Sequence, residues 1–315
     1  MPANPLIPSV FHEPWWLDAV TNRQWQEVTV NTGTQMVARL PFVLSRRWWL
    51  PTLIMPPLTH SLGPAIDEGQ GSSNTRALRR LDLTEALLAQ LPTVDHVGLC
   101  CHRGVSEVLA FQARGFASAP QFTVEIAPAP QDQLWANLRD KTRNVIRRCQ
   151  QTSTVVQLDD PQEFVRFYLE NLQRQQRQNY FLLNRVEALY EACAARGRVQ
   201  LLGVQNTAQQ LLGAAMIVND EHRSYYLLTT RRPDVQDNGV ISLLIWEALR
   251  HSAARGRTFD FDGIASEGAS RFYAGFGGQL APRYVVRKSS RRFMALRVLR
   301  NRLKFNDRNH YAPIF

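Results

Sequence analysis

The chain has 315 residues, of which 44% are hydrophobic and 20% charged, and its mean hydropathy is -0.28. This composition is typical of a soluble globular protein long enough for two domains, and it excludes a disordered chain, a collagen and a disulfide scaffold. The formal net charge is +10, and residues 283–308 alone hold ten Lys or Arg against one Asp, a net charge of +9. Such a concentration favours an anionic partner, namely phosphate, nucleic acid or an acidic membrane. A C-terminal helix docked through its leucines, with its arginines in solvent, explains the same pattern.

The start of the chain shows no basic stretch followed by an apolar one, so we predict no secretory signal and a cytoplasmic protein. A long charge-free run, residues 48–66, contains four prolines, which remove hydrogen bonds that a membrane helix needs. We therefore predict strands and a loop there. The four cysteines lack paired spacing and the seven histidines form no metal-binding motif, which predicts reduced thiols and no metal.

Hydrophobic periodicity and turn residues predict an alternation of strands and helices along the whole chain. In the first half the expected elements are a hairpin at 27–30 and 36–44, a helix at 75–91, a strand at 96–101, a helix at 105–114 and a strand at 122–126. In the second half they are helices at 134–150, after Asp160-Pro161 and at 184–196, strands at 199–204, 211–218 and 224–230, a buried helix at 240–254, a strand at 258–262, a short helix at 271–276, a strand at 284–287 and a basic helix at 290–304.

The two halves resemble each other. Shifted by 162 residues, 84–126 aligns with 246–288 without a gap, and seven of the 43 pairs are identical, including Glu85-Ala86-Leu87 against Glu247-Ala248-Leu249. The predicted elements also follow in the same order. We infer two copies of one mixed α/β unit.

The order of elements in 199–288 resembles the GCN5-related N-acetyltransferase (GNAT) fold, and two copies resemble the double-domain branch with the FemAB and BioF2-like transferases. Segments similar to that branch include FHEPWWLDA at 11–19, LRDKTRNVIRR at 138–148 and FDFDG at 259–263. The resemblance implies an α/β (mixed α+β) fold of two tandem GNAT-like domains, each a mixed, mostly antiparallel sheet flanked by helices. The expected domains are a non-catalytic one at 1–130, a catalytic one at 131–290, and a basic helix and tail at 291–315.

The resemblance also implies where the acyl donor binds, namely at the end of the third strand of the second copy and the start of the helix after it. These donor-binding residues are Leu228, Thr229, Thr230, Asn238, Gly239, Val240 and Ser242. Exposed amides and the helix dipole would suit a phosphate there. The family's pyrophosphate loop is not intact, however, since Gly239 alone is in place, and Asn238-Gly239 also fits a simple turn and cap. We expect no tightly bound cofactor, with acyl-CoA or an acyl carrier protein as co-substrate.

Asp260 and Asp262 alternate in a predicted strand, so both carboxylates should point to one face, where they could order an amine and take its proton. The first copy has Gly98 and Cys100 at these positions, which favours the second copy as the working one. Tyr273, where many relatives have Lys, is a candidate proton donor to the leaving group. Salt bridges or capping would explain the two aspartates equally simply. The candidate acceptor-binding residues are Glu267, Arg271 and Tyr226.

The function that follows is an N-acyltransferase, which moves an acyl group from a CoA-like or carrier-protein thioester to an amine such as an amino sugar or a cell-envelope precursor. An aminoacyl-tRNA-dependent FemAB-type transferase is the alternative, in which the basic tail would meet tRNA phosphates. A non-catalytic module that binds an anionic polymer or a membrane through that tail is the third.

Overall fold

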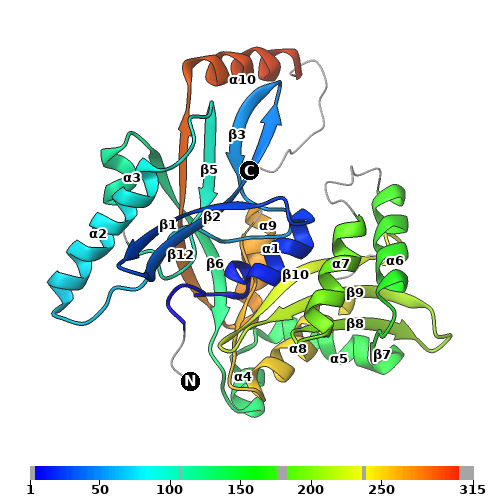
Figure 1. Cartoon of the computed structure of the whole chain (residues 1–315). Coiled ribbons are helices and arrows are strands. Elements are labelled where there is room, and N and C mark those ends of the chain that lie inside the picture. Colours follow the sequence, from blue (N-terminus) through cyan, green and yellow to red (C-terminus); the bar gives the residue numbers. More distant parts are fainter. Residues whose placement is uncertain (1–3, 107, 176–182, 236–238, 265, 305–315) are drawn as a thin grey trace. The chain divides into compact units, whose positions relative to one another are not determined.

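The computed structural model describes residues 4–106, 108–175, 183–235, 239–264 and 266–304 (Figure 1). The chain forms two compact units: unit 1 contains residues 1–121 and 282–315, and unit 2 contains residues 122–281. Compared with the expected domains, 282–315 belong with the N-terminal residues. The expected basic helix is present as α10 (Arg291–Lys304), and the tail after it lies outside the described residues.

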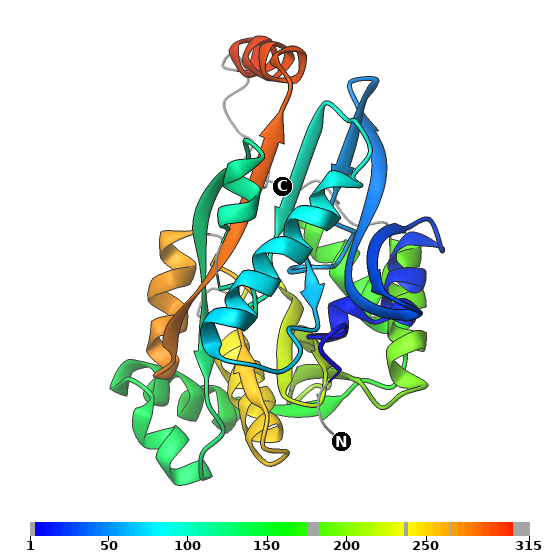
Figure 2. The same cartoon turned by 60° about the vertical axis from the view of Figure 1, so that its left-hand side comes forward.

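Unit 1 is built on a mixed sheet with strand order β1-β2-β3-β5-β12-β6, and β4 pairs with β2. β3 and β5 are parallel, while β1–β2, β2–β3 and β5–β12 are antiparallel. Helices α2 and α3 cover one face of the sheet (Figure 2), and their buried side chains, such as Leu87 and Phe111, share a core with Leu40 and Leu99 from the strands. The elements are η1 (Val10–His12), α1 (Pro14–Thr21), β1 (Gln26–Thr32), β2 (Gln35–Arg47), β3 (Leu50–Ile54), β4 (Ala65–Ile66), α2 (Ser73–Ala89), β5 (His96–Cys100), α3 (Leu109–Ala113), β6 (Ala117–Ile126), β12 (Gln279–Ser289) and α10.

Unit 2 has strand order β6-β11-β10-β9-β8-β7, in which only β10 and β11 of the described pairs are parallel. The buried helix α8 packs on this sheet, and Leu244, Ile245 and Trp246 lie in its core. The elements, besides the ends of β6 and β12, are α4 (Gln131–Asn137), α5 (Asp140–Thr152), β7 (Ser153–Gln157), α6 (Pro161–Arg174), α7 (Leu183–Ala194), β8 (Val199–Asn206), β9 (Leu211–Asn219), β10 (Arg223–Arg231), α8 (Gly239–Ala253), β11 (Thr258–Asp260), α9 (Glu267–Tyr273) and η2 (Ala274–Phe276).

Both halves of the chain contain a similar run of elements: a strand, a helix, a strand parallel to the first, a helix and an antiparallel strand. The run is β3-α2-β5-α3-β6 in the first half, where the short β4 precedes α2, and β10-α8-β11-α9-β12 in the second, where η2 precedes β12. β6 begins in unit 1 and ends in unit 2, and β12 runs from unit 2 to unit 1. This order is the one predicted from the repeat, whereas the duplication behind it stays a prediction.

The helix predicted at 134–150 is wrong in one respect, since it is two helices that break at Leu138 and Arg139. Both residues have extended backbone, and the Arg139 amide donates to the Gly275 carbonyl at 3.0 Å. The guanidinium of Arg143 donates to the carbonyls of Ala136 and Leu138, each at 2.8 Å. These bonds satisfy the carbonyls at the end of α4, which would otherwise lack partners. The helix predicted at 105–114 is also shorter, since only α3 forms.

Within the described residues, no helix combines the length and the apolar character needed to cross a bilayer. The same residues contain no group of His, Cys, Asp and Glu side chains suited to hold a metal ion.

Candidate functional site

Strand β10 is irregular where the sequence places the acyl donor. Its pairing with β9 passes from Tyr226 opposite Ile217 to Leu228 opposite Met216, so Leu227 is an extra residue. Its parallel pairing with β11 covers only 223–225. Among the described residues, no strand pairs with β10 on its β11 side after Tyr225. The backbone amides and carbonyls of the bulged stretch on that side can therefore bind a ligand.

The first turn of α8 lies against Gly213 of β9, which pairs with Arg231 at the end of β10. A Cβ atom added at Gly213 of β9 would lie 2.4 Å from Val240 Cγ1 and 3.3 Å from the Thr230 carbonyl oxygen, so glycine permits the close approach. The first amides of a helix lack intrahelical acceptors and favour an anion.

The predicted donor-binding residues differ in how far their side chains are exposed to solvent. Thr229 is exposed, and Leu228 and Thr230 are buried. The side chains of Val240 and Ser242 are buried too, which leaves their backbone, with that of Gly239, to meet a donor. Asn238 lies outside the described residues.

Strand β11 ends at Asp260, two residues earlier than predicted, because the carboxylate of Asp260 folds the chain into a turn. Its Oδ1 accepts hydrogen bonds from the Asp262 amide at 2.8 Å and from Thr123 Oγ1 at 2.6 Å. Thr123 Oγ1 also accepts from the Gly263 amide at 3.0 Å. Asp262 takes a left-handed conformation, with φ of 59°. The expectation that both carboxylates alternate on one strand face is therefore wrong, although the turn keeps them adjacent.

Asp260 is only 3% exposed and belongs to a buried charge network. Its Oδ2 lies 3.9 Å from a guanidinium nitrogen of Arg223, which also contacts Glu125 at 2.9 Å. Burial first, and then the charge of Asp262, raise the pKa of Asp260 to about 6. Burial alone would lower the pKa of Arg223, but the surrounding carboxylates more than offset it, so that pKa is raised. Sequence reasoning missed Thr123 and Arg223, and no motif marks them.

Asp262 and Tyr273 lie close together above a cluster of aromatic rings. The pKa of Tyr273 is raised by burial and further by the charge of Asp262. Its ring packs on Phe261 with centroids 4.2 Å apart. Tyr226 is 5% exposed, and burial chiefly raises the pKa of its hydroxyl, with a smaller contribution from Tyr273. At neutral pH both tyrosines are therefore protonated, so the phenol of Tyr273 can donate a proton.

The remaining acceptor-binding candidates lie on the surface. Glu267 and Arg271 form an ion pair of 2.6 Å across one turn of α9, and both side chains are 78% exposed. The structure thus brings Asp260, Asp262, Tyr273 and Tyr226 together in one region of unit 2, with Glu267 and Arg271 at its outer helix.

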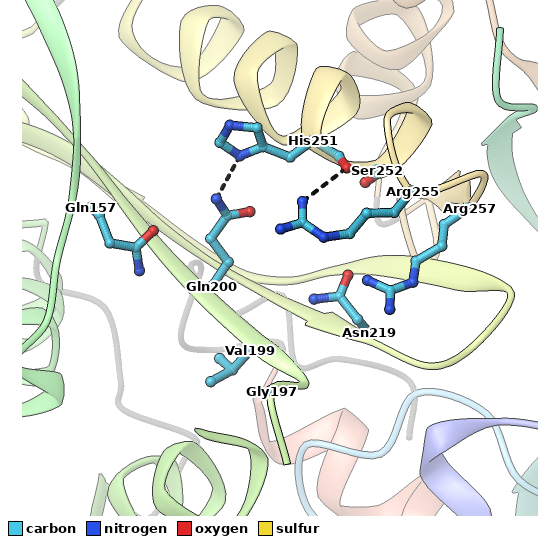
Figure 3. A pocket seen from close by; sticks show the side chains of 9 residues that line it. All are labelled: Gln157, Gly197, Val199, Gln200, Asn219, His251, Ser252, Arg255 and Arg257. Carbon is cyan, nitrogen blue, oxygen red and sulfur yellow. Dashed lines mark hydrogen bonds between the residues drawn. The ribbon is translucent and has the colours of Figure 1, made fainter. Parts of the chain in front are cut away.

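A separate cavity of about 200 Å³ lies at the other end of α8 (Figure 3). His251, in the last turn of α8, contacts Gln200 at 2.5 Å, while Arg255 and Arg257 lie beside Asn219. Burial and two neighbouring arginines, Arg198 and Arg255, lower the pKa of Arg257. This cavity is polar and cationic, and no predicted site residue lines it.

Three comparisons with known proteins bear on this geometry. The family model described as "Acetyltransferase (GNAT) domain" matches residues 136–272. No curated protein matches the sequence.

Among solved structures, FemX has a TM-score of 0.66 at 14% identity and covers 90% of this chain and 92% of its own. The C-terminal domain of a putative lysylphosphatidylglycerol synthetase from Agrobacterium fabrum has a TM-score of 0.59 at 11% identity and covers 92% and 96%. A tandem GNAT protein from the clavulanic acid biosynthesis pathway has a TM-score of 0.51 at 11% identity and covers 84% and 82%. At these identities the likeness is one of fold. Residues 136–272 therefore match the GNAT family model, and the chain has a GNAT-like fold, as the order of its elements predicted.

Proposed function

We propose that unit 2 is an N-acyltransferase that moves an acyl group from a thioester to an amine. The observation that carries the proposal is the bulged end of β10, open on its β11 side, next to the Asp262–Tyr273 pair. A thioester carbonyl is polarised by backbone amides of the kind that a bulge leaves open, and a phosphate is favoured at the nearby start of α8.

The two side chains can move the protons that the reaction requires. As the amine nitrogen attacks the thioester carbon, the C–N bond forms, the C–S bond breaks, and the amine must lose a proton. In this proposal Asp262 takes that proton, and Tyr273, protonated because its pKa is raised, donates one to the departing thiolate. A proton passed from Asp262 to Tyr273 then restores the site, so amide and thiol are the products.

Asp260 positions this pair in the proposal and does not touch the substrate. Its carboxylate is held by Thr123 and Arg223, and it binds the amide of Asp262. The left-handed turn at Asp262 depends on that bond, because non-glycine residues rarely adopt such a conformation without support.

Donor binding and turnover test the proposal together. We expect acetyl-CoA or CoA to raise the melting temperature of the full chain, and mass spectrometry to detect an acylated product in a panel of amines and amino sugars. Asp262→Asn should keep donor binding and lower kcat by about 100-fold or more. Asp234→Asn, at an exposed carboxylate of the same unit, is the control and should change nothing. Full turnover by Asp262→Asn would refute the assignment.

Aminoacyl transfer is the second candidate, favoured by the fold likeness to FemX and to a domain named for lysylphosphatidylglycerol synthesis. The site chemistry would be the same with an ester as the donor. Stabilisation by charged tRNA and not by CoA would favour this candidate, and stabilisation by neither would count against both.

A further inference from the structure

The β2–β3 hairpin of unit 1 ends in a strained and exposed turn. Its two turn residues, Trp48 and Trp49, have φ of 52° and 58°. Such a two-residue turn favours Asn-Gly, because both positions are left-handed and side chains with a Cβ are strained there. Trp49 is 76% exposed, so burial in the core does not offset the strain. An exposed tryptophan held in an unfavourable turn indicates a function outside the fold.

Helix α10 lies beside this turn (Figure 1), and Phe293 packs it against the turn and against β5. The ring of Phe293 stacks on His96 with centroids 4.4 Å apart and lies 5.2 Å from Trp48. Arg300, two turns on, has its guanidinium 5.5 Å from the Trp48 ring.

Three apolar side chains of α10 are exposed on the side away from Phe293, where Arg291 is exposed as well. At 100° per residue, Met294, Val298 and Leu299 fall away from the side that carries Phe293. Their exposed fractions are 45%, 48% and 55%. Together with Trp49 they form what we name the hairpin–helix surface.

This surface is strongly positive. Segments 46–50 and 291–301 contain six arginines and no acidic residue, and Asp95, from the neighbouring turn, pairs with Arg292 at 3.0 Å. Burial, and then repulsion by Arg300 and Arg297, lower the pKa of Arg47.

The same field reaches His96, whose pKa is lowered to about 4 by burial first and then by Arg47, Arg287 and Arg297. The guanidinium groups of Arg47, Arg287, Arg297 and Arg300 thus lie within each other's field, and this concentration of positive charge favours a negatively charged partner.

We propose that the hairpin–helix surface docks on a membrane that contains anionic phospholipids. A helix whose exposed methionine, valine and leucine side chains stand among arginines, next to an exposed tryptophan, fits the boundary between headgroups and acyl chains. A nucleic acid would match the charge but offers no apolar medium for Val298 and Leu299. A second copy would bring six arginines against six across a twofold axis, which is repulsive. The proposal is independent of the function proposed for unit 2.

Co-sedimentation of the full chain with vesicles tests this proposal. We expect binding to phosphatidylcholine vesicles that contain phosphatidylglycerol, weaker binding as salt rises, and little binding to phosphatidylcholine alone. Trp49→Ser should weaken binding on the order of tenfold, because the indole loses its apolar contact.

Arg297→Gln separates a binding role from a structural one. Arg297 repels Arg47, Arg287 and His96, so its neutralisation should keep or raise thermal stability while it weakens vesicle binding about fivefold. Leu78→Ser and Arg76→Gln change an exposed leucine and an exposed arginine of α2 and should leave binding unchanged.

Three results would overturn the proposal. The first is equal binding to both kinds of vesicle, or to neither. The second is binding that is as sensitive to the α2 controls as to Trp49→Ser. The third is evidence for another occupant of the surface. A stable dimer that Val298→Asp dissociates would assign the surface to a second copy of the chain. Binding of tRNA that Trp49→Ser and Val298→Asp both weaken would assign it to a nucleic acid.

Discussion

Asp260→Asn should remove a specific part of the pH dependence of stability. The carboxyl binds its proton more tightly in the folded state, where its pKa is about 6 instead of 3.8. Below about pH 4 it is protonated in both states, and as pH rises through 6 the folded chain must ionise it at a cost. The difference between the two pKa values corresponds to about 3 kcal/mol in the free energy of unfolding. The free energy of unfolding should therefore fall by about 3 kcal/mol between pH 4 and 6 from this group, and stay level above.

Urea unfolding of the wild type and of Asp260→Asn between pH 4 and 8, followed by tryptophan fluorescence, measures this contribution. Asn keeps an oxygen for Thr123 and the Asp262 amide but has no charge to bury. The free energy of unfolding of the variant minus that of the wild type should rise by about 3 kcal/mol as pH increases from 4 to 8, because only the wild type must ionise the buried carboxyl. A difference that does not change with pH would refute the reasoning, and so would one that changes in the opposite direction.

Two further substitutions probe the supports of the site. Thr123→Val removes the hydrogen-bond donor to Asp260 and the acceptor for the Gly263 amide, and it should lower the free energy of unfolding by about 2–3 kcal/mol. In the wild type the hydrogen bond from Thr123 lowers the pKa of Asp260. Without that bond the pKa should rise, so the pH-dependent loss of stability should extend above pH 6. An unchanged pH dependence would contradict the assigned role. Gly213→Ala places a Cβ 2.4 Å from a methyl group of Val240; it should destabilise by about 1–3 kcal/mol and weaken donor binding in a titration. Gly268→Ala, whose Cβ meets nothing nearer than 3.8 Å, is its control, and equal effects of the two would contradict the proposed contact.

Regular elements with strong local signals were predicted well. Helix α8 was expected at 240–254 and forms at Gly239–Ala253, because a long apolar run bounded by glycines leaves little choice. The break between α4 and α5 was missed because the apolar periodicity continues through it. Its cause is the carbonyl of Gly275, far along the chain, which takes the Arg139 amide.

The site residues proposed from the sequence stay a prediction, and the structure changes the geometry expected for them. The pattern FDFD suggested two equivalent carboxylates, whereas the fold makes Asp260 a buried support and leaves Asp262 next to Tyr273. The difference arises from Thr123, which is 137 residues away from Asp260 and carries no signal in the sequence. The basic C-terminal helix was expected from its spacing of leucines and arginines, but its contact with the Trp48–Trp49 turn is a tertiary contact that no local pattern contains.

Hydrogen–deuterium exchange of the full chain with and without acetyl-CoA tests the central claim most directly. The account predicts that the ligand slows exchange in peptides covering 227–230 and 239–242, where the bulged strand and the start of α8 would hold the donor. Protection confined to the cationic cavity of Arg255 and Arg257, at the other end of α8, would contradict it.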